Sequence, residues 1–114
     1  MIEDIEDFFA PVLRVSIKRM FGGHGVYAEG RILAIEADGE IFLKVDDETR
    51  GFFESHGSSP FVYEKKAGQQ MVMSYYCVPV AAYDDDPLRR ACIEAALEAA
   101  MRAPLPKKKA VGKR

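Results

Sequence analysis

The residues best placed to do chemistry gather in one short stretch, RMFGGHGVY, which runs from Arg19 to Tyr27. It holds three glycines, Gly22, Gly23 and Gly25, with His24 among them. A glycine-rich loop cradles phosphate when it leads from a strand into a helix, because backbone N–H groups then face the anion. Here the flanking residues predict a strand on each side, and no Lys-Ser or Lys-Thr pair follows. The stretch therefore predicts a sharp hairpin corner, with or without a bulge, rather than a nucleotide site.

Metal binding is the second chemistry to weigh. A metal site needs several ligands at reinforcing spacings, such as CxxC or HExxH, and the candidates here stand singly: His24, His56, Cys77 and Cys92. Convergence of His24 with Cys77 across a sheet is one alternative, but the spacing favours a surface histidine and a core cysteine. We expect no metal and no cofactor, and we expect both cysteines to be reduced, buried small hydrophobes.

Paired carboxylates are the third possibility. Asp46 and Asp47 form one group and residues 84–86 another, but both groups stand where a helix is predicted to begin and where carboxylates act as caps. Ser74 lacks a G-x-S-x-G surround and an evident base. No constellation combines a nucleophile, a base and an orienting group, so the sequence predicts that the protein is not an enzyme. A small enzyme is kept as the third reading.

Apolar spacing and turn signals predict the elements that position these residues. The segment IEDIEDFFAPVL has helix spacing and contains Pro11 near its end. Asp38-Gly39 between two β-rich runs predicts a tight hairpin. Strands are expected at 14–20, 25–28, 31–37, 40–45, 61–66 and 71–78, with further helices at 46–57 and 88–102. This order predicts a two-layer α+β fold, in which an antiparallel sheet has its helices on one side.

Finer features of three elements follow from the same patterns. Gly57 is expected to close the second helix in the left-handed conformation, and acids before Pro87 are expected to start the last one. In the last helix, Glu98 and Arg102 are spaced to form an ion pair, and alanines form the face toward the sheet. In the last strand, alternation places one set of side chains on a single side: Met71, Met73, Tyr75 and Cys77.

Length and composition describe an ordinary globular chain. The 114 residues suffice for one domain with a core, and 48% are apolar and 30% charged. No apolar run approaches the ~20 residues that a membrane helix needs. The start MIEDIEDFF is acidic, whereas a signal peptide begins basic. We therefore expect a cytoplasmic protein with no membrane association.

Charge divides the chain into a body and a tail. The last ten residues hold five of the 16 basic groups and none of the 18 acidic ones, which leaves 11 positive and 18 negative charges in the body, a net of −7. Binding along a DNA backbone requires several cations on one surface, and the body is poorly supplied with them. We expect a single domain over 1–103 and a disordered basic tail over 104–114. Its cations are the candidate nucleic-acid residues: Lys107, Lys108, Lys109, Lys113 and Arg114.

Aromatic residues are dense in the predicted sheet. The set comprises Tyr27, Phe61, Tyr63, Tyr75 and Tyr76. We expect most of them to line the core or a self-association face. The alternative is that single-stranded nucleic acid stacks on Tyr75 or Tyr76, but the net negative charge of the body disfavours it.

Taken together, the blocks KRMFGGHGVY, LKVDDETR, FVYEKK and MSYYCVP resemble the TfoX N-terminal domain family, over about Arg14 to Met101. The resemblance implies an α-β-α-β-α sandwich like that of secretion chaperones, a bacterial regulatory role associated with competence, the uptake of DNA, and no catalytic residues. Members often carry a second, C-terminal helical domain. The family's signature residues fall here on Arg19, Met20, Phe21, Gly22, Gly23, Tyr27, Lys44, Val45, Asp46, Tyr63, Ser74 and Tyr75. The family usually has an aromatic or similar residue at the position of His24, which is therefore given no role.

The sequence thus predicts a non-enzymatic regulatory module that acts through protein contacts, with an unidentified partner and a homodimer formed through sheet or helix faces. The alternative is a nucleic-acid-binding accessory protein that uses the basic tail. For Arg19 and Lys44, ion pairing with Asp46 or Asp47 is favoured over a free polar patch. The candidate interaction patch comprises Arg19, Phe21, Gly22, Gly23, Tyr27, Lys44 and Tyr75.

Overall fold

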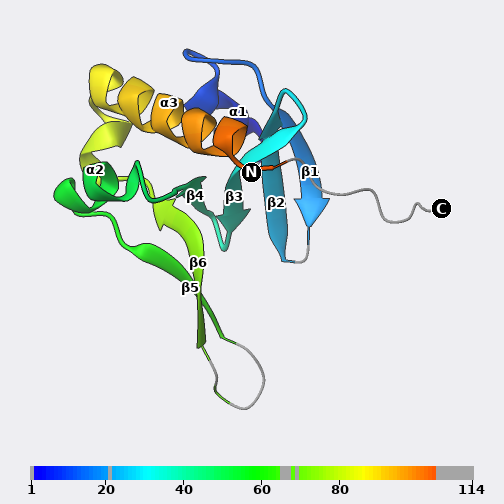
Figure 1. The fold of residues 1–114 in the computed structure, drawn as a ribbon. Helices are drawn as coiled ribbons and strands as arrows, with labels where there is room; N and C mark the ends of the chain where they lie inside the picture. The colour runs from blue at the N-terminus through cyan, green and yellow to red at the C-terminus, as the bar shows by residue number, and fades with distance from the viewer. Residues whose placement is uncertain (1, 21, 65–67, 69, 105–114) are drawn as a thin grey trace.

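The computed structural model describes residues 2–20, 22–64, 68 and 70–104 of the chain, and Figure 1 shows the order of its elements. Helix α1 spans Ile2–Phe9, and helix α3, at the other end, spans Asp86–Arg102. In chain order, the short helix α2 (Arg50–Ser55) precedes the last two strands, and the 3₁₀ helix η2 (Val80–Tyr83) stands between the last strand and α3. The strands are β1 (Ser16–Met20), β2 (Gly23–Ala28), β3 (Arg31–Ala37), β4 (Glu40–Lys44), β5 (Pro60–Glu64) and β6 (Gln70–Cys77).

The strands form one antiparallel sheet in the order β1-β2-β3-β4-β6-β5. Tight turns join β1 to β4 in succession, and α2 lies in the connection from β4 to β5. Helices α1 and α3 lie together over one face of the sheet (Figure 1). The predicted α+β fold, with an antiparallel sheet and helices on one side, is confirmed.

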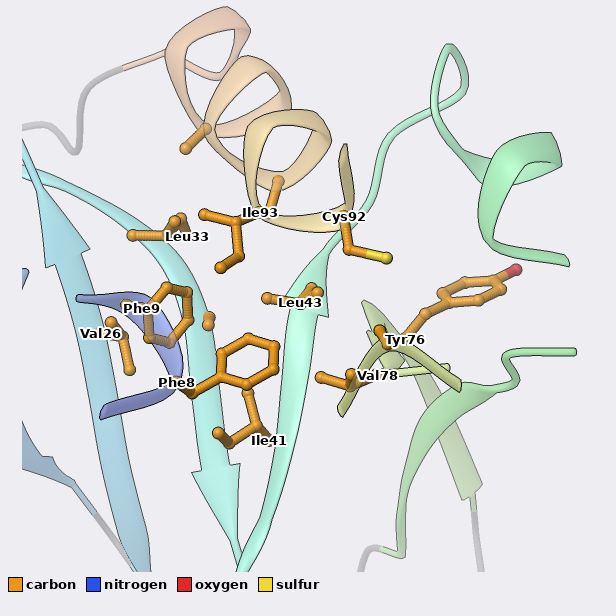
Figure 2. Packing of buried hydrophobic residues seen from close by; sticks show 14 of the residues in the cluster. Phe8, Phe9, Val26, Leu33, Ile41, Leu43, Tyr76, Val78, Cys92 and Ile93 are labelled. Atoms are coloured by element: carbon orange, nitrogen blue, oxygen red, sulfur yellow. The ribbon is translucent and has the colours of Figure 1, made fainter. Parts of the chain in front are cut away.

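The core lies between this sheet face and the helices (Figure 2). Ile5, Phe8 and Phe9 of α1 are buried against it, because the apolar stripe of the helix faces inward while its acids stay in solvent. From α3 the core receives Ile93 and Cys92, which are fully buried. The sheet contributes a row of apolar residues, and α3 adds small ones that allow close approach: Val26, Leu33, Ala34, Leu43, Val78, Ala96 and Ala100.

An irregularity in the sheet adds one residue to the core. The register between β2 and β3 shifts at Val26/Tyr27, so that Leu33 has no direct partner. Leu33 and Ala34 are consecutive, yet both are fully buried. In a regular strand they would point to opposite faces. The bulge therefore turns an extra leucine toward the helices.

The start of α3 and the end of α2 follow the predicted capping residues. The side chain of Asp85 accepts a hydrogen bond from Leu88 N at 3.0 Å, and Pro87 stands in the first turn of α3. Helix α2 begins later than predicted, at Arg50 rather than residue 46, and its N-cap is Thr49, while Oδ1 of Asp46 accepts hydrogen bonds from Glu48 N and Thr49 N in the turn before the helix. Gly57 follows α2 with φ of +84°, as expected of a helix-closing glycine.

The two free cysteines have different surroundings. Cys92 is fully buried, as predicted, whereas Cys77 is only partly buried, so the prediction that both lie in the core is wrong. The reason is strand alternation: Tyr76 and Val78 point toward the helices, which turns Cys77 to the other face.

Within the described residues, no helix is both long and apolar enough to cross a membrane. Phe21 lies outside the described residues, and so do residues 105–114, which include all the cations of the predicted tail.

Candidate functional site

The glycine stretch forms the corner between β1 and β2. Gly22 has φ of +69°, which L-residues adopt only at a cost, and Met20 pairs with Gly23 at the start of the returning strand. A Cβ on Gly23 would clash with the backbone carbonyl of Glu36 on β3. The prediction of a sharp hairpin corner is therefore confirmed, and the glycines serve the turn and the close approach of two strands.

His24 has a partner that the sequence did not identify. Its Nδ1 lies 2.7 Å from Oε1 of Glu36, and Oε2 of Glu36 accepts a hydrogen bond from Gly39 N at 2.7 Å. Glu36 is only 5% exposed. Burial alone would raise the pKa of Glu36, but the hydrogen bonds from His24 and Gly39 outweigh it and hold the pKa below its usual value. The pair ties the β1–β2 corner to the β3–β4 turn.

A metal site at His24 and Cys77 is not supported. His24 is on β2 and Cys77 on β6, and two strands separate them in the sheet. His24 lies in a cross-strand row with Arg19 and Glu36, whereas Cys77 pairs with Phe42 on the opposite face. Across residues 2–20, 22–64, 68 and 70–104, no three His, Cys, Asp or Glu side chains are grouped as metal ligands.

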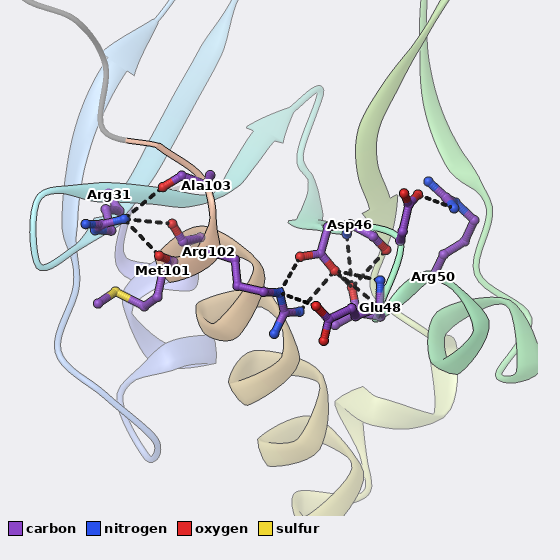
Figure 3. A network of polar contacts seen from close by, with 10 residues as sticks. Arg31, Asp46, Glu48, Arg50, Met101, Arg102 and Ala103 are labelled. Carbon is purple, nitrogen blue, oxygen red and sulfur yellow. Dashed lines mark hydrogen bonds and ion pairs between the residues drawn. The ribbon is translucent and has the colours of Figure 1, made fainter.

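The acidic residues after β4 form a polar network with α3 (Figure 3). Arg102 holds Asp46 with two nitrogens, Nε to Oδ2 at 2.7 Å and Nη2 to Oδ1 at 3.0 Å. The guanidinium of Arg102, with the amides of Thr49 and Glu48, lowers the pKa of Asp46 to about 2. The predicted pairing of Arg102 with Glu98 is wrong, because Arg102 reaches Asp46, and more distantly Glu48, instead.

The remaining members of this network are also structural. Asp47 pairs with Arg50 at 2.8 Å. Arg31 donates hydrogen bonds to the carbonyls of Met101 and Ala103, at 3.0 and 2.9 Å, and so satisfies the end of α3 (Figure 3). The favoured pairing of Arg19 or Lys44 with Asp46 or Asp47 is therefore wrong: both acids have other cationic partners.

The sheet face opposite the helices is the open face, defined here by side chains that alternate with the core residues. One cross-strand row runs through the register pairs Lys18, Gly25, Ile35, Phe42 and Cys77. Neighbouring positions of the same face hold Met20, Tyr27, Ile32, Phe61, Met73, Lys44 and Tyr75. Neither α1 nor α3 covers this face (Figure 1).

The open face contains a large, partly open hollow. Its volume is about 740 Å³, which falls in the range typical of ligand sites. Apolar side chains from four strands form most of its lining: Met20, Ile32, Ile35, Phe61, Val62, Met73 and Tyr75. Gly22, Gly23, His24, Glu36 and Asp38 border it at the glycine corner. Phe42 and Phe61 contact each other beside it, with ring centroids 4.7 Å apart.

Two lysines lie against tyrosine rings on this face. The ammonium nitrogen of Lys18 is 5.1 Å from the ring centroid of Tyr27, and that of Lys44 is 5.2 Å from the centroid of Tyr75. Burial, with a contribution from the nearby Tyr27 phenol, raises the pKa of Tyr75.

The structure brings together only part of the predicted interaction patch. Tyr27, Lys44 and Tyr75 share the open face, and Gly22 and Gly23 border its hollow. Arg19 pairs with His24 on the helix side of the sheet, and Phe21 lies outside the described residues. The sequence placed Met73 on the same side of its strand as Tyr75, but it did not assign Lys18, Met20 and Ile35 to this face. Period-two alternation within β1 and β3 is the signal that could have found these three.

The tyrosine next in sequence behaves differently. Tyr76 is only 7% exposed, and its hydroxyl donates to Glu54 Oε2 at 2.7 Å. Stacking of a nucleic-acid base on Tyr76 is therefore excluded by burial. On Tyr75 the ring is partly buried and carries Lys44 against it.

The structure thus combines a helix-covered sheet face, an apolar open face, and carboxylates at Asp46 and Asp85 that act in an ion pair and a helix cap. The chain matches the profile of the TfoX N-terminal domain over residues 7–100, most of its length, and it belongs to that family. This match supports a regulatory domain related to competence in general terms, and the family is not a known enzyme family. No curated protein matches the chain.

Proposed function

We propose that the protein is a non-enzymatic regulatory domain that acts through protein contacts on its open face. The observation that carries this proposal is the apolar hollow on a sheet face that α1 and α3 leave uncovered. Exposed apolar surface of this kind marks interaction sites in soluble proteins. Regulation of competence is the process that membership in the family favours.

The partners of the acidic side chains support a role without catalysis. The carboxylates best placed for acid–base chemistry have other partners: Asp46 is held by Arg102, and Asp85 caps α3. These contacts are those of a stable scaffold, in which binding rather than bond-breaking is the activity.

A native pull-down tests the proposal. The full chain serves as bait in two extracts of its own cells, one before and one after nuclease treatment, and each eluate is assayed for protein and for nucleic acid. We expect a protein partner that is lost with Met73→Glu on the open face and kept with Arg90→Glu on the outer side of α3. Recovery of nucleic acid alone, before nuclease treatment, would contradict a protein-contact function.

Self-association is part of the proposal, through a sheet or helix face. Apolar side chains exposed outside the open face include Val80, 85% exposed, and Met101, 44% exposed. Light scattering with mass determination at low micromolar concentration should give twice the 12.7 kDa chain mass. A strictly monomeric species would remove the dimer from the proposal and leave the partner contact standing.

Nucleic-acid binding is the second candidate, favoured by the partly buried rings of Tyr27 and Tyr75 on an open sheet face. A salt titration of oligonucleotide binding, with the full chain and with a chain ending at residue 104, separates the two. This candidate requires affinity that falls steeply with salt and vanishes without the basic tail.

A further inference from the structure

Two cations on the open face lack an acidic partner among the described residues. None of the ion pairs in the described part of the chain involves Lys18 or Lys44. We propose that the open face is a docking groove for a short segment of a partner protein, one that places an apolar side chain beside one or two carboxylates. This inference rests on the proposed function and specifies the chemistry of the partner.

The hollow supplies the apolar half of the groove. Met20 and Ile35 come from the β1–β4 side, while Phe61 and Met73 come from the β5–β6 hairpin. A side chain that enters this hollow exchanges water for thioether, aliphatic and aromatic contacts, which is favourable for any large apolar residue.

The two lysines supply the charged half. Gly25 lacks a side chain where a Cβ would lie 2.7 Å from Met20 Sδ and 3.0 Å from Tyr27 Cε1, so Tyr27 closes over β2 next to the hollow. Lys18 and Lys44 lie against Tyr27 and Tyr75, and contact with the rings limits the conformations of their side chains. An ammonium group held at a ring face keeps N–H donors for a carboxylate.

The far end of the groove fixes the direction of the segment. Glu36 and Asp38 border the hollow at the glycine corner, and Glu36 is already paired with His24. Asp38 is exposed there and repels another carboxylate. The acidic part of the segment must therefore lie toward Lys18 and Lys44, with its apolar residue toward Met20.

Charge selects this occupant over three others. The chain's own tail, Lys107 to Arg114, carries five cations and no acid, so the lysines repel it. A second copy that docks by the same face brings the lysines of both copies together, because a two-fold interface is self-complementary. A nucleic acid meets a body of net charge −7 with only two described lysines on this face, whereas a segment with one or two carboxylates needs no more than two.

Selection from a random dodecapeptide phage library tests the proposal, with the immobilised full chain as target. We expect enriched sequences in which Leu, Ile, Met or Phe adjoins Glu or Asp. Backbone amide shifts from one enriched synthetic peptide should map to β1, β2, β6 and β5, on residues such as Lys18, Tyr75 and Met73.

Matched variants then assign the contacts. Lys18→Gln combined with Lys44→Gln should weaken peptide affinity about tenfold, and Met73→Ser should weaken it by a similar factor. Arg19→Gln is the matched control. It removes the same charge from the residue next to Lys18, but Arg19 faces the helix side of the sheet. We expect its affinity to stay within about twofold of the original chain. Far-UV circular dichroism and the Tm of each variant verify that the fold is retained.

Several outcomes overturn the proposal: no enrichment, enrichment of basic or uncharged peptides, shifts on the helix side, or equal loss in Arg19→Gln. Concentration-dependent shifts of the open face without peptide, or tighter binding there of a single-stranded oligonucleotide, also overturn it in favour of a second copy or a nucleic acid. The proposed function fails separately. A cellular protein partner retained equally by the original chain and by the lysine variant would support the proposed function and contradict a docking groove on this face.

Discussion

Arg102 and Asp46 are 56 residues apart in sequence and form a two-point ion pair that joins the last turn of α3 to the end of β4 (Figure 3). Asp46 also receives the amides of Glu48 and Thr49 ahead of α2. One carboxylate therefore fixes three elements, the sheet, α2 and α3. The pair is a structural device on the helix side and takes no part in the open face.

Replacement of Arg102 by Gln should lower the free energy of unfolding at pH 7 by about 1 kcal/mol. Asp46 and Arg102 are 29% and 35% exposed, so solvent screening holds the pair below the value that a fully buried pair would give. Urea denaturation measures the change. Arg90→Gln is the control on the same helix, since its 3.8 Å pair with Glu94 is about half exposed and should be worth less than about 0.5 kcal/mol.

The same pair has a defined pH dependence. The pKa of Asp46 falls to about 2 in the folded chain, so its contribution is complete above the ordinary aspartate value of about 3.9 and is lost as the pH falls toward 2. The stability difference between the original chain and Arg102→Gln should therefore be constant from pH 7 to about 5 and shrink below pH 4. A difference that stays constant down to pH 2.5 would show that Arg102 acts by packing rather than by charge.

Gly22 and Gly23 should differ sharply in their response to alanine. Gly23→Ala places a methyl group against the Glu36 carbonyl, a backbone atom that cannot move without parting β2 from β3, and should cost about 2 kcal/mol or more. Gly22→Ala finds open space and pays only for φ of +69°, about 1 kcal/mol. Thermal unfolding of both variants measures the difference. Equal costs would mean that the turn conformation, and not the strand approach, requires both glycines.

Much of this fold was predictable because its signals are local. Period-two alternation and the Asp38-Gly39 turn give the strands, and Asp85 with Pro87 gives the start of α3. The ion pairs were not predictable in the same way. Lys44 is two residues from Asp46, which suggested a pair, but strand geometry turns Lys44 to the open face, and docking of α3 delivers Arg102 to Asp46.

The candidate site was predicted only in part for a related reason. Tyr27, Lys44 and Tyr75 were chosen from the family signature, and they do share a face. The signature does not give the strand register. The register places Lys18 on the open face, where it contacts the Tyr27 ring, and places the adjacent Arg19 opposite His24 on the helix side. The bulge at Leu33 has no sequence signal that we identify, and it changes which side chains of β3 face inward.

The adjacent tyrosines of β6 should differ in their contribution to stability, because Tyr76 faces the core and Tyr75 faces the open side of the sheet. Tyr76→Phe removes the 2.7 Å hydrogen bond to Glu54 and should cost about 1 kcal/mol. That bond is the first cause of the raised pKa of Tyr76, so its contribution is present below the ordinary tyrosine pKa of about 10 and is lost as the pH rises through the higher folded value. Tyr75→Phe keeps a ring for Lys44 and should change stability by less than about 0.5 kcal/mol. Chemical denaturation at pH 7 compares them, and a reversed order would mean that the faces are misassigned.

The two thiols should react at different rates because Cys92 lies in the core and Cys77 lies on the open face. Burial raises the pKa of Cys92 to about 11, so at pH 8 its thiol stays protonated, and the side chain is fully buried as well. Cys77 is partly exposed on the open face, beside Ser59. A thiol-specific chromogenic disulfide should therefore label one cysteine in the folded chain, and the second only at the rate of unfolding. Cys77→Ser, the matched variant, should abolish the fast phase and leave the slow one. Two fast thiols in the original chain would mean that α3 separates readily from the sheet, and the helix-side core described here would then be open in solution.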